Sequence, residues 1–229
     1  TLAAINLAWE KGATAVEIDV YLTRDQKIIL SHDKSTLRCS GVDLQIAETD
    51  SDELRKLDVG KHKGDQYAGE KMPFFQDVLA TIPAGGKILC EVKCGPEILP
   101  HIGDLLSASG KRSQVAIISF NLDVVTQSKK QMPDVQAYWL QMTKRDPETN
   151  QWLPYEEDRL IQTALDNGLD GLDLHYAMVT KEFADKIRAA NLALWTWTVN
   201  DPAEARQQME LQPDGMATDR CAWMREQLR

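Results

Sequence analysis

The sequence has no long apolar run, and the longest such stretches are far too short to span a membrane. It has few basic residues for its size: 26 Lys and Arg stand against 35 Asp and Glu, giving a net charge of -9. General nucleic-acid binding needs a basic surface, so this balance argues against it. A small phosphodiester is still an acceptable ligand, because a local cation can reverse the field within one cleft.

Cysteine is also scarce, and none of the four cysteines forms the C-x-x-C pairs of a zinc site. Cys90 and Cys94 are expected on the same face of a strand as buried free thiols rather than as a disulfide. The sequence shows neither a signal-peptide pattern nor an initiator Met, so the compartment stays open.

The 229 residues read as one globular domain, 1–229, with polar insertions at about 34–72 and 141–155. No low-complexity linker interrupts a repeated alternation of strand and helix, which predicts a parallel sheet. Strands are expected at 15–22, 27–31, 87–92, 115–119, 135–140, 171–174, 193–199 and 215–217. Helices are expected at 1–11, 73–82, 97–109, 122–131, 158–167, 181–190, 202–210 and 220–228.

Polar side chains interrupt or end two of these apolar strands. Glu17 and Asp19 are two residues apart, as are Glu91 and Lys93, so each pair shares one face of its strand. The intervening apolar residues are expected to point toward covering helices. The flanking residues are apolar or small, which is typical of strands buried on both faces in a parallel sheet.

Inward carboxylates of this kind repel one another and lose hydration unless a cation neutralises them. Lys93 could supply that cation as a buried ion pair. One ammonium against Glu17, Asp19 and Glu91 leaves an excess of negative charge, which favours a divalent metal. An all-oxygen ligand set suits Mg²⁺ or Ca²⁺, without deciding between them.

The order of these motifs resembles that of the glycerophosphodiester phosphodiesterase family: Glu-x-Asp at 17–19, a short hairpin, His32-Asp33, an insertion, and Glu-Val-Lys at 91–93. The likeness covers nearly the whole chain. It extends to Thr23-Arg24-Asp25, Ser119-Phe120, Trp197-Thr198-Val199-Asn200 and Ala217-Thr218-Asp219-Arg220.

Two features depart from the family pattern. The family hairpin usually turns at Asp-Gly, whereas this chain has Asp25-Gln26 and so lacks the residue that best tolerates positive φ. The family also opens with a strand ending in His-Arg-Gly, and its next segment, Glu-Asn-Thr, aligns only through Thr1. The family's first catalytic His and its phosphate-binding Arg are therefore expected upstream of Thr1, or are missing.

The resemblance implies a (β/α)8 TIM barrel with the hairpin and the first insertion after the Glu-x-Asp strand. Seven barrel strands are expected here when the hairpin is left out, and a strand upstream of Thr1 would complete eight. Active sites of such barrels lie at the carboxyl ends of the strands.

The resemblance further implies metal-dependent hydrolysis of a glycerophosphodiester to glycerol 3-phosphate and an alcohol. Glu17, Asp19 and Glu91 would be metal ligands, and His32 a general acid or base. Lys93 would bind substrate and offset phosphoryl charge. Phe120 and Trp197 would line the glycerol pocket, with core packing as the alternative for Trp197.

Several alternatives stay open. Asp33 could orient His32 or cap the following turn. Without the His-Arg segment, the chain could be an impaired barrel that binds a phosphodiester or metal without turnover. A lipid enzyme of the sphingomyelinase phospholipase D type would need an apolar entrance, which 34–72 does not offer. His62, His101 and His175 lack partners at metal-ligand spacing and are interpreted as surface or satisfied buried residues, although His175 ends a strand. The head-group alcohol and the oligomeric state are not predicted.

Overall fold

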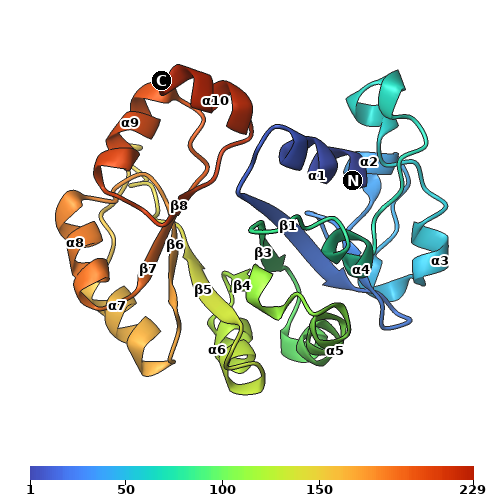
Figure 1. The fold of residues 1–229 in the computed structure, drawn as a ribbon, viewed down its shortest axis with the longest axis horizontal. Helices are drawn as coiled ribbons and strands as arrows, with labels where there is room; N and C mark the ends of the chain where they lie inside the picture. The colour runs from blue at the N-terminus through green and yellow to red at the C-terminus, as the bar shows by residue number, and fades with distance from the viewer.

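Eight strands form one curled sheet, in the spatial order β2-β1-β3-β4-β5-β6-β7-β8, in a computed structural model that describes all 229 residues (Figure 1). β1 pairs antiparallel with β2, and every other neighbouring pair is parallel. The strands are β1 (Ala15–Leu22), β2 (Ile28–Leu30), β3 (Lys87–Val92), β4 (Val115–Ser119), β5 (Gln136–Gln141), β6 (Gly171–His175), β7 (Ala193–Trp197) and β8 (Gly215–Met216). The seven predicted parallel strands are thus confirmed.

The sheet curls as in a (β/α)8 barrel but is open between β1 and β8. β8 pairs only with β7, and the first half of β1 pairs only with β3. Across this opening, Arg225 donates hydrogen bonds to the backbone oxygens of Lys11 at 3.3 Å and Gly12 at 2.6 Å. One side chain near the end of the chain therefore links the two sides of the open sheet.

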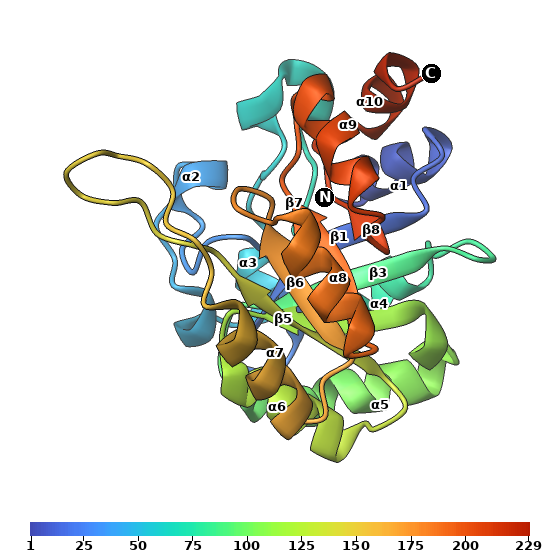
Figure 2. The same cartoon turned by 90° about the vertical axis from the view of Figure 1, so that its left-hand side faces the viewer.

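Helices cover the outer face of the sheet (Figure 2). The helices of the chain are α1 (Leu2–Glu10), α2 (Leu37–Ser40), α3 (Ser51–Leu54), α4 (Phe75–Leu79), α5 (Leu99–Ser109), α6 (Leu122–Gln131), α7 (Glu157–Asp166), α8 (Lys181–Ala189), α9 (Pro202–Glu210) and α10 (Cys221–Gln227), and of these α2 and α3 belong to the first insertion. None of them is both long and apolar enough to cross a membrane. Ile18 and Val92 are buried in the same cluster as side chains of α4 and α5, as the strand alternation predicts.

The inner face of the sheet carries a second, smaller apolar cluster, formed by Leu89, Ala116, Ile118, Tyr138 and Leu140. Its members occupy alternate positions of β3, β4 and β5 and fill the interior of the curl. On the neighbouring strand β1, and further along β3, the inward positions are polar. The apolar cluster therefore packs in the interior of the curl, directly next to the polar residues of the candidate site.

The first insertion contains regular structure and a small core that the sequence did not predict. It contains α2, α3 and 3-10 turns at Ile46–Glu48, Lys61–Lys63 and Asp65–Tyr67. Four of its apolar residues pack with Ile29 of β2 into a separate small core: Ile46, Leu54, Val59 and Met72. This core fixes the insertion against the hairpin strand.

Two local predictions also need correction. The helix expected at 73–82 is shorter, because α4 begins at Phe75 with Phe74 as its N-cap, and Pro73 precedes it. The expected strand at 193–199 ends at Trp197. The hairpin turn accommodates its missing glycine with Gln26 at φ 60°, and Thr23 Oγ1 donates to Asp25 Oδ1 at 2.6 Å. The sequence departure thus alters the turn without preventing it.

Candidate active site

Three carboxylates meet on the inner face of the sheet, two from the first half and middle of β1 and one from near the carboxyl end of β3. Glu17 and Asp19 lie on β1, and Asp19 is the register partner of Glu91 on β3. One carboxylate oxygen from each of the three residues lies within 4.8 Å of the other two. The structure therefore brings together the three residues that the sequence predicted as metal ligands, although it does not assign them that role.

Lys93 is placed among these carboxylates. Its Nζ atom lies 2.8 Å from Glu91 Oε1 and 3.3 Å from Asp19 Oδ1, and its side chain is 17% exposed. Burial lowers the pKa of Lys93, but the ion pairs with Glu91 and Asp19 outweigh it, so the pKa is raised overall. The ammonium therefore stays charged at neutral pH.

One ammonium does not neutralise the cluster. Desolvation by the surrounding protein and then the charges of Asp19 and Glu91 raise the pKa of Glu17, although its side chain is partly reached by solvent. Burial raises the pKa of Glu91 despite its hydrogen bond from Lys93. Crowded hard oxygen donors with excess negative charge are a suitable ligand set for Mg²⁺ or Ca²⁺. A buried ion pair with Lys93 and a divalent metal are therefore compatible, because the ion pair forms and the three carboxylates still carry excess negative charge.

His32 follows β2 near this cluster, and its side chain is 64% exposed. Its Nδ1 lies 2.7 Å from Asp33 Oδ1, while Arg38 Nε donates to Asp33 Oδ2 at 2.5 Å. These hydrogen bonds from Arg38 and His32 lower the pKa of Asp33 to about 2. Ionised Asp33 can only accept, so Nδ1 carries the proton and Nε2 is left for a ligand. Of the two roles open to Asp33, the structure supports orienting His32.

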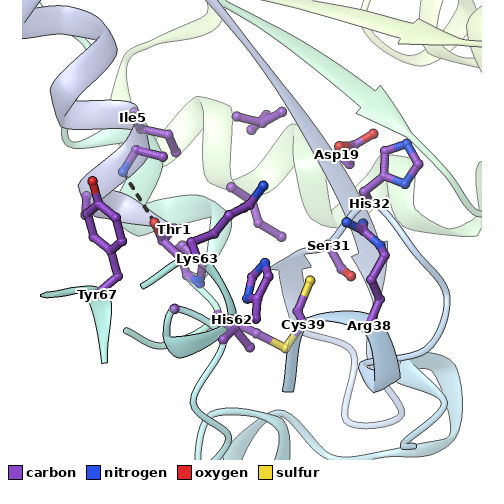
Figure 3. Close-up of a pocket in the computed structure, with 18 of the residues that line it drawn as sticks. Thr1, Ile5, Asp19, Ser31, His32, Arg38, Cys39, His62, Lys63 and Tyr67 are labelled. Atoms are coloured by element: carbon purple, nitrogen blue, oxygen red, sulfur yellow. Dashed lines mark hydrogen bonds between the residues drawn. The ribbon is translucent and has the colours of Figure 1, made fainter. Parts of the chain in front are cut away.

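A cavity of about 610 Å³ adjoins the cluster (Figure 3). α1, β1, β2 and the first insertion supply its walls, and Asp19 and His32 line it on the side of the carboxylates. His62 and Lys63 line it from the insertion. His62, which has no partner at metal-ligand spacing in the sequence, was predicted to be a surface or satisfied buried residue, and the structure places it in the wall of this cavity.

Phe120 and Trp197 are brought together at the mouth of the curl. Their ring centroids are 5.7 Å apart at an interplanar angle of 90°. Phe120 directly follows β4 and is 45% exposed, and Trp197 ends β7. Trp195, two residues earlier, stacks on Tyr138 in the interior instead. Both indoles pack against the inner apolar cluster, so Trp197 takes part in core packing as well as meeting Phe120 at the mouth.

Asp173 is an inward-facing acid that the sequence analysis missed. It lies on β6, is only 4% exposed, and its carboxyl makes neither a hydrogen bond nor an ion pair with any other residue. Burial, and then the charge of Glu91, raise the pKa of Asp173 to about 8. A signal was present in the sequence, since Asp173 and His175 repeat the two-residue spacing of Glu17 and Asp19.

This burial predicts a pH-dependent stability. Folded Asp173 keeps its proton up to about pH 8, whereas an unfolded Asp ionises near 3.9. Between these values the folded state binds more protons, so the free energy of unfolding falls by about 1.4 kcal/mol per pH unit as pH rises. We expect Asp173→Asn to remove this contribution and to gain stability relative to the parent between about pH 5 and pH 8.

The measurement is urea unfolding at several pH values with EDTA present. Asp104→Asn serves as the control, because Asp104 is exposed on α5 and makes no side-chain hydrogen bond. Parallel pH profiles for the parent and Asp173→Asn would contradict the prediction.

Comparison with known proteins gives a consistent result. The glycerophosphoryl diester phosphodiesterase family matches residues 1–222. A glycerophosphodiester phosphodiesterase of Caldanaerobacter subterraneus is 26% identical over 228 residues, covering 96% of this chain and 87% of that protein.

Solved structures show the same fold. A phosphodiesterase of Oleispira antarctica, in complex with the product sn-glycerol-3-phosphate, superposes with a TM-score of 0.86 at 23% identity, covering 100% of this chain and 90% of that one. A glycerophosphoryl diester phosphodiesterase structure from Silicibacter pomeroyi has a TM-score of 0.86 at 21% identity and covers 100% and 87%. The fold and the family match agree over nearly all residues. The chain therefore belongs to the glycerophosphoryl diester phosphodiesterase family.

Proposed function

We propose that the chain hydrolyses glycerophosphodiesters to glycerol 3-phosphate and an alcohol, with one divalent cation, Mg²⁺ or Ca²⁺. Membership of the family supports a phosphoric diester hydrolase. The C. subterraneus relative is named a glycerophosphodiester phosphodiesterase, and the O. antarctica structure holds sn-glycerol-3-phosphate. The observation that carries the metal dependence is the set of three carboxylates within 4.8 Å of one another.

In this proposal Glu17, Asp19 and Glu91 hold the cation. When bound, the cation acts as a Lewis acid that withdraws charge from a phosphoryl oxygen. The three carboxylates come from two paired strands, so the sheet fixes their separation before any ligand arrives. Their mutual repulsion is relieved by the cation, which favours its binding.

Lys93 is proposed to stabilise negative charge on the phosphoryl oxygens. Glu91 and Asp19 hold its ammonium in place, so the group needs little reorganisation when charge develops on the substrate. Preorganised donors of this kind contribute about 3 kcal/mol to transition-state stabilisation.

His32 is proposed to exchange a proton with the reacting or leaving oxygen. Asp33 holds the ring through Nδ1, which directs Nε2 as the exchanging atom. Imidazoles change charge near neutral pH and are therefore suited to this task. The side chain is exposed and lines the adjoining cavity, so solvent or a ligand can approach it.

Phe120 and Trp197 are proposed to contact the carbon face of the glycerol moiety. Their perpendicular rings form an apolar corner at the carboxyl ends of β4 and β7. An apolar corner opposite charged groups suits a ligand with one apolar and one anionic side.

The experiment is release of glycerol 3-phosphate from glycerophosphoethanolamine, with and without EDTA, followed by addition of Mg²⁺ or Ca²⁺. We expect activity to disappear with EDTA and to return with one of the two ions. Activity that is insensitive to EDTA would refute the metal dependence. Cation binding, measured by calorimetry, without release of product would replace the proposal with a barrel that binds but does not hydrolyse.

A further inference from the structure

A row of aromatic rings extends from Trp197 along the mouth of the curl to the second insertion. The insertion folds back on itself so that Arg145 and Trp152 pair as an antiparallel bridge, and it projects from the carboxyl end of β5 (Figure 2). The Trp152 ring centroid lies 4.7 Å from that of His175, which in turn lies 5.3 Å from that of Trp197.

His175 is held firmly between these rings. Trp197 meets it at an interplanar angle of 82°, Trp152 at 42°, and Tyr176 stacks on it at 27°. Arg145 places its guanidinium 4.1 Å from the Trp152 ring centroid, on the insertion. The imidazole therefore has a fixed orientation beside the proposed glycerol corner.

The two nitrogens of His175 have different roles. Nδ1 accepts a hydrogen bond from the backbone N–H of Ala177 at 3.3 Å, so the neutral ring carries its proton on Nε2. Burial, and then the charge of Arg145, lower the pKa of His175 and keep the ring neutral. Nε2 makes no hydrogen bond to any other residue, and it is a donor of fixed direction.

We propose that His175 is a specificity-determining residue that donates a hydrogen bond from Nε2 to a hydroxyl of the substrate's glycerol moiety. The inference rests on the proposed function and deepens it. β6 brings His175 to the mouth on the same inward face as buried Asp173, and its ring touches Trp197, one of the two aromatic residues assigned to glycerol. Trp152 is a positioning residue, because its ring packs against the imidazole of His175 from the insertion.

A site that hydrogen-bonds a substrate hydroxyl discriminates against an analogue without it. The test compares glycerophosphoethanolamine with the analogue in which propyl replaces glycerol. We expect His175→Phe, which keeps an aromatic ring between the indoles, to lower kcat/KM for the glycerol diester roughly 3- to 10-fold. The value for the propyl analogue should not change, so the preference for glycerol shrinks by the same factor.

Two further variants make the result specific. His175→Gln can place an amide N–H near the position of Nε2 and should restore part of the preference. His101→Phe is the matched control, because His101 lies on α5 on the outer face of the sheet. Equal losses on both substrates would mean that His175 has only a structural role, and unchanged discrimination would mean that Nε2 is not used.

Binding separates this inference from the proposed function. Tryptophan fluorescence can follow glycerol 3-phosphate and propyl phosphate, since Trp152 and Trp197 flank His175. Suppose that no diester is hydrolysed, that the protein binds glycerol 3-phosphate more tightly than propyl phosphate, and that His175→Phe abolishes this difference in affinity. The proposed function then fails and the subsite stands. If diesters are hydrolysed and neither binding nor kcat/KM distinguishes glycerol from propyl, the subsite fails and the function stands.

Discussion

Glu91→Gln is expected to lower glycerol 3-phosphate release by roughly 1000-fold, because loss of one ligand charge removes several kcal/mol of metal-based stabilisation. The amide keeps the size of the side chain, and Lys93 retains Asp19 as a partner at 3.3 Å. Affinity for Mg²⁺ or Ca²⁺, measured by calorimetry, should fall together with kcat/KM.

Glu97→Gln is the matched control for this prediction. Glu97 lies in the 3-10 turn Pro96–Ile98 that follows β3, and its carboxylate accepts only the backbone N–H of Gly95, at 3.0 Å. It is therefore close in sequence but outside the acidic cluster. Unchanged cation affinity and unchanged rate in Glu91→Gln would rule out Glu91 as a metal ligand.

His32→Gln is expected to reduce kcat by roughly 100- to 10,000-fold, the range contributed by a general acid or base. The amide can still hydrogen-bond Asp33 but cannot exchange a proton, so cation affinity should not change. Rates at saturating substrate and cation titrations together provide the measurement.

His62→Gln is the companion variant, because His62 lines the same cavity but makes no hydrogen bond to a carboxylate. Its kcat should remain close to that of the parent. A His32→Gln enzyme of full activity would show that the proton is exchanged elsewhere.

The acidic cluster could be predicted because its geometry is almost entirely local. Two-residue spacing fixes which face of a strand carries Glu17 and Asp19, and again Glu91 and Lys93. β1 and β3 are consecutive parallel strands once the hairpin strand is set aside, so their carboxyl ends had to meet. Only the register between the two strands, which places Asp19 opposite Glu91, could not be predicted from the sequence.

The remainder of the site depends on long-range geometry. His175 acquires its surroundings from Trp197 on the next strand and from Trp152 in an insertion whose path the sequence did not specify. The pKa of Asp173 is raised because the curled sheet buries the carboxyl and, to a smaller extent, because it brings β6 within the electrostatic reach of Glu91. The core of the first insertion escaped prediction because Ile46, Leu54, Val59 and Met72 follow no strand or helix period.

The hydrogen bonds from Arg225 to Lys11 and Gly12 have a consequence for how the chain folds. They join residues separated by 214 and 213 positions. Contacts of such sequence separation are costly in loop-closure entropy and slow to form. The guanidinium also places positive charge at the carboxyl end of α1, where the helix dipole favours it. The contact between α10 and the end of α1 is therefore expected to be among the last to form as the chain folds.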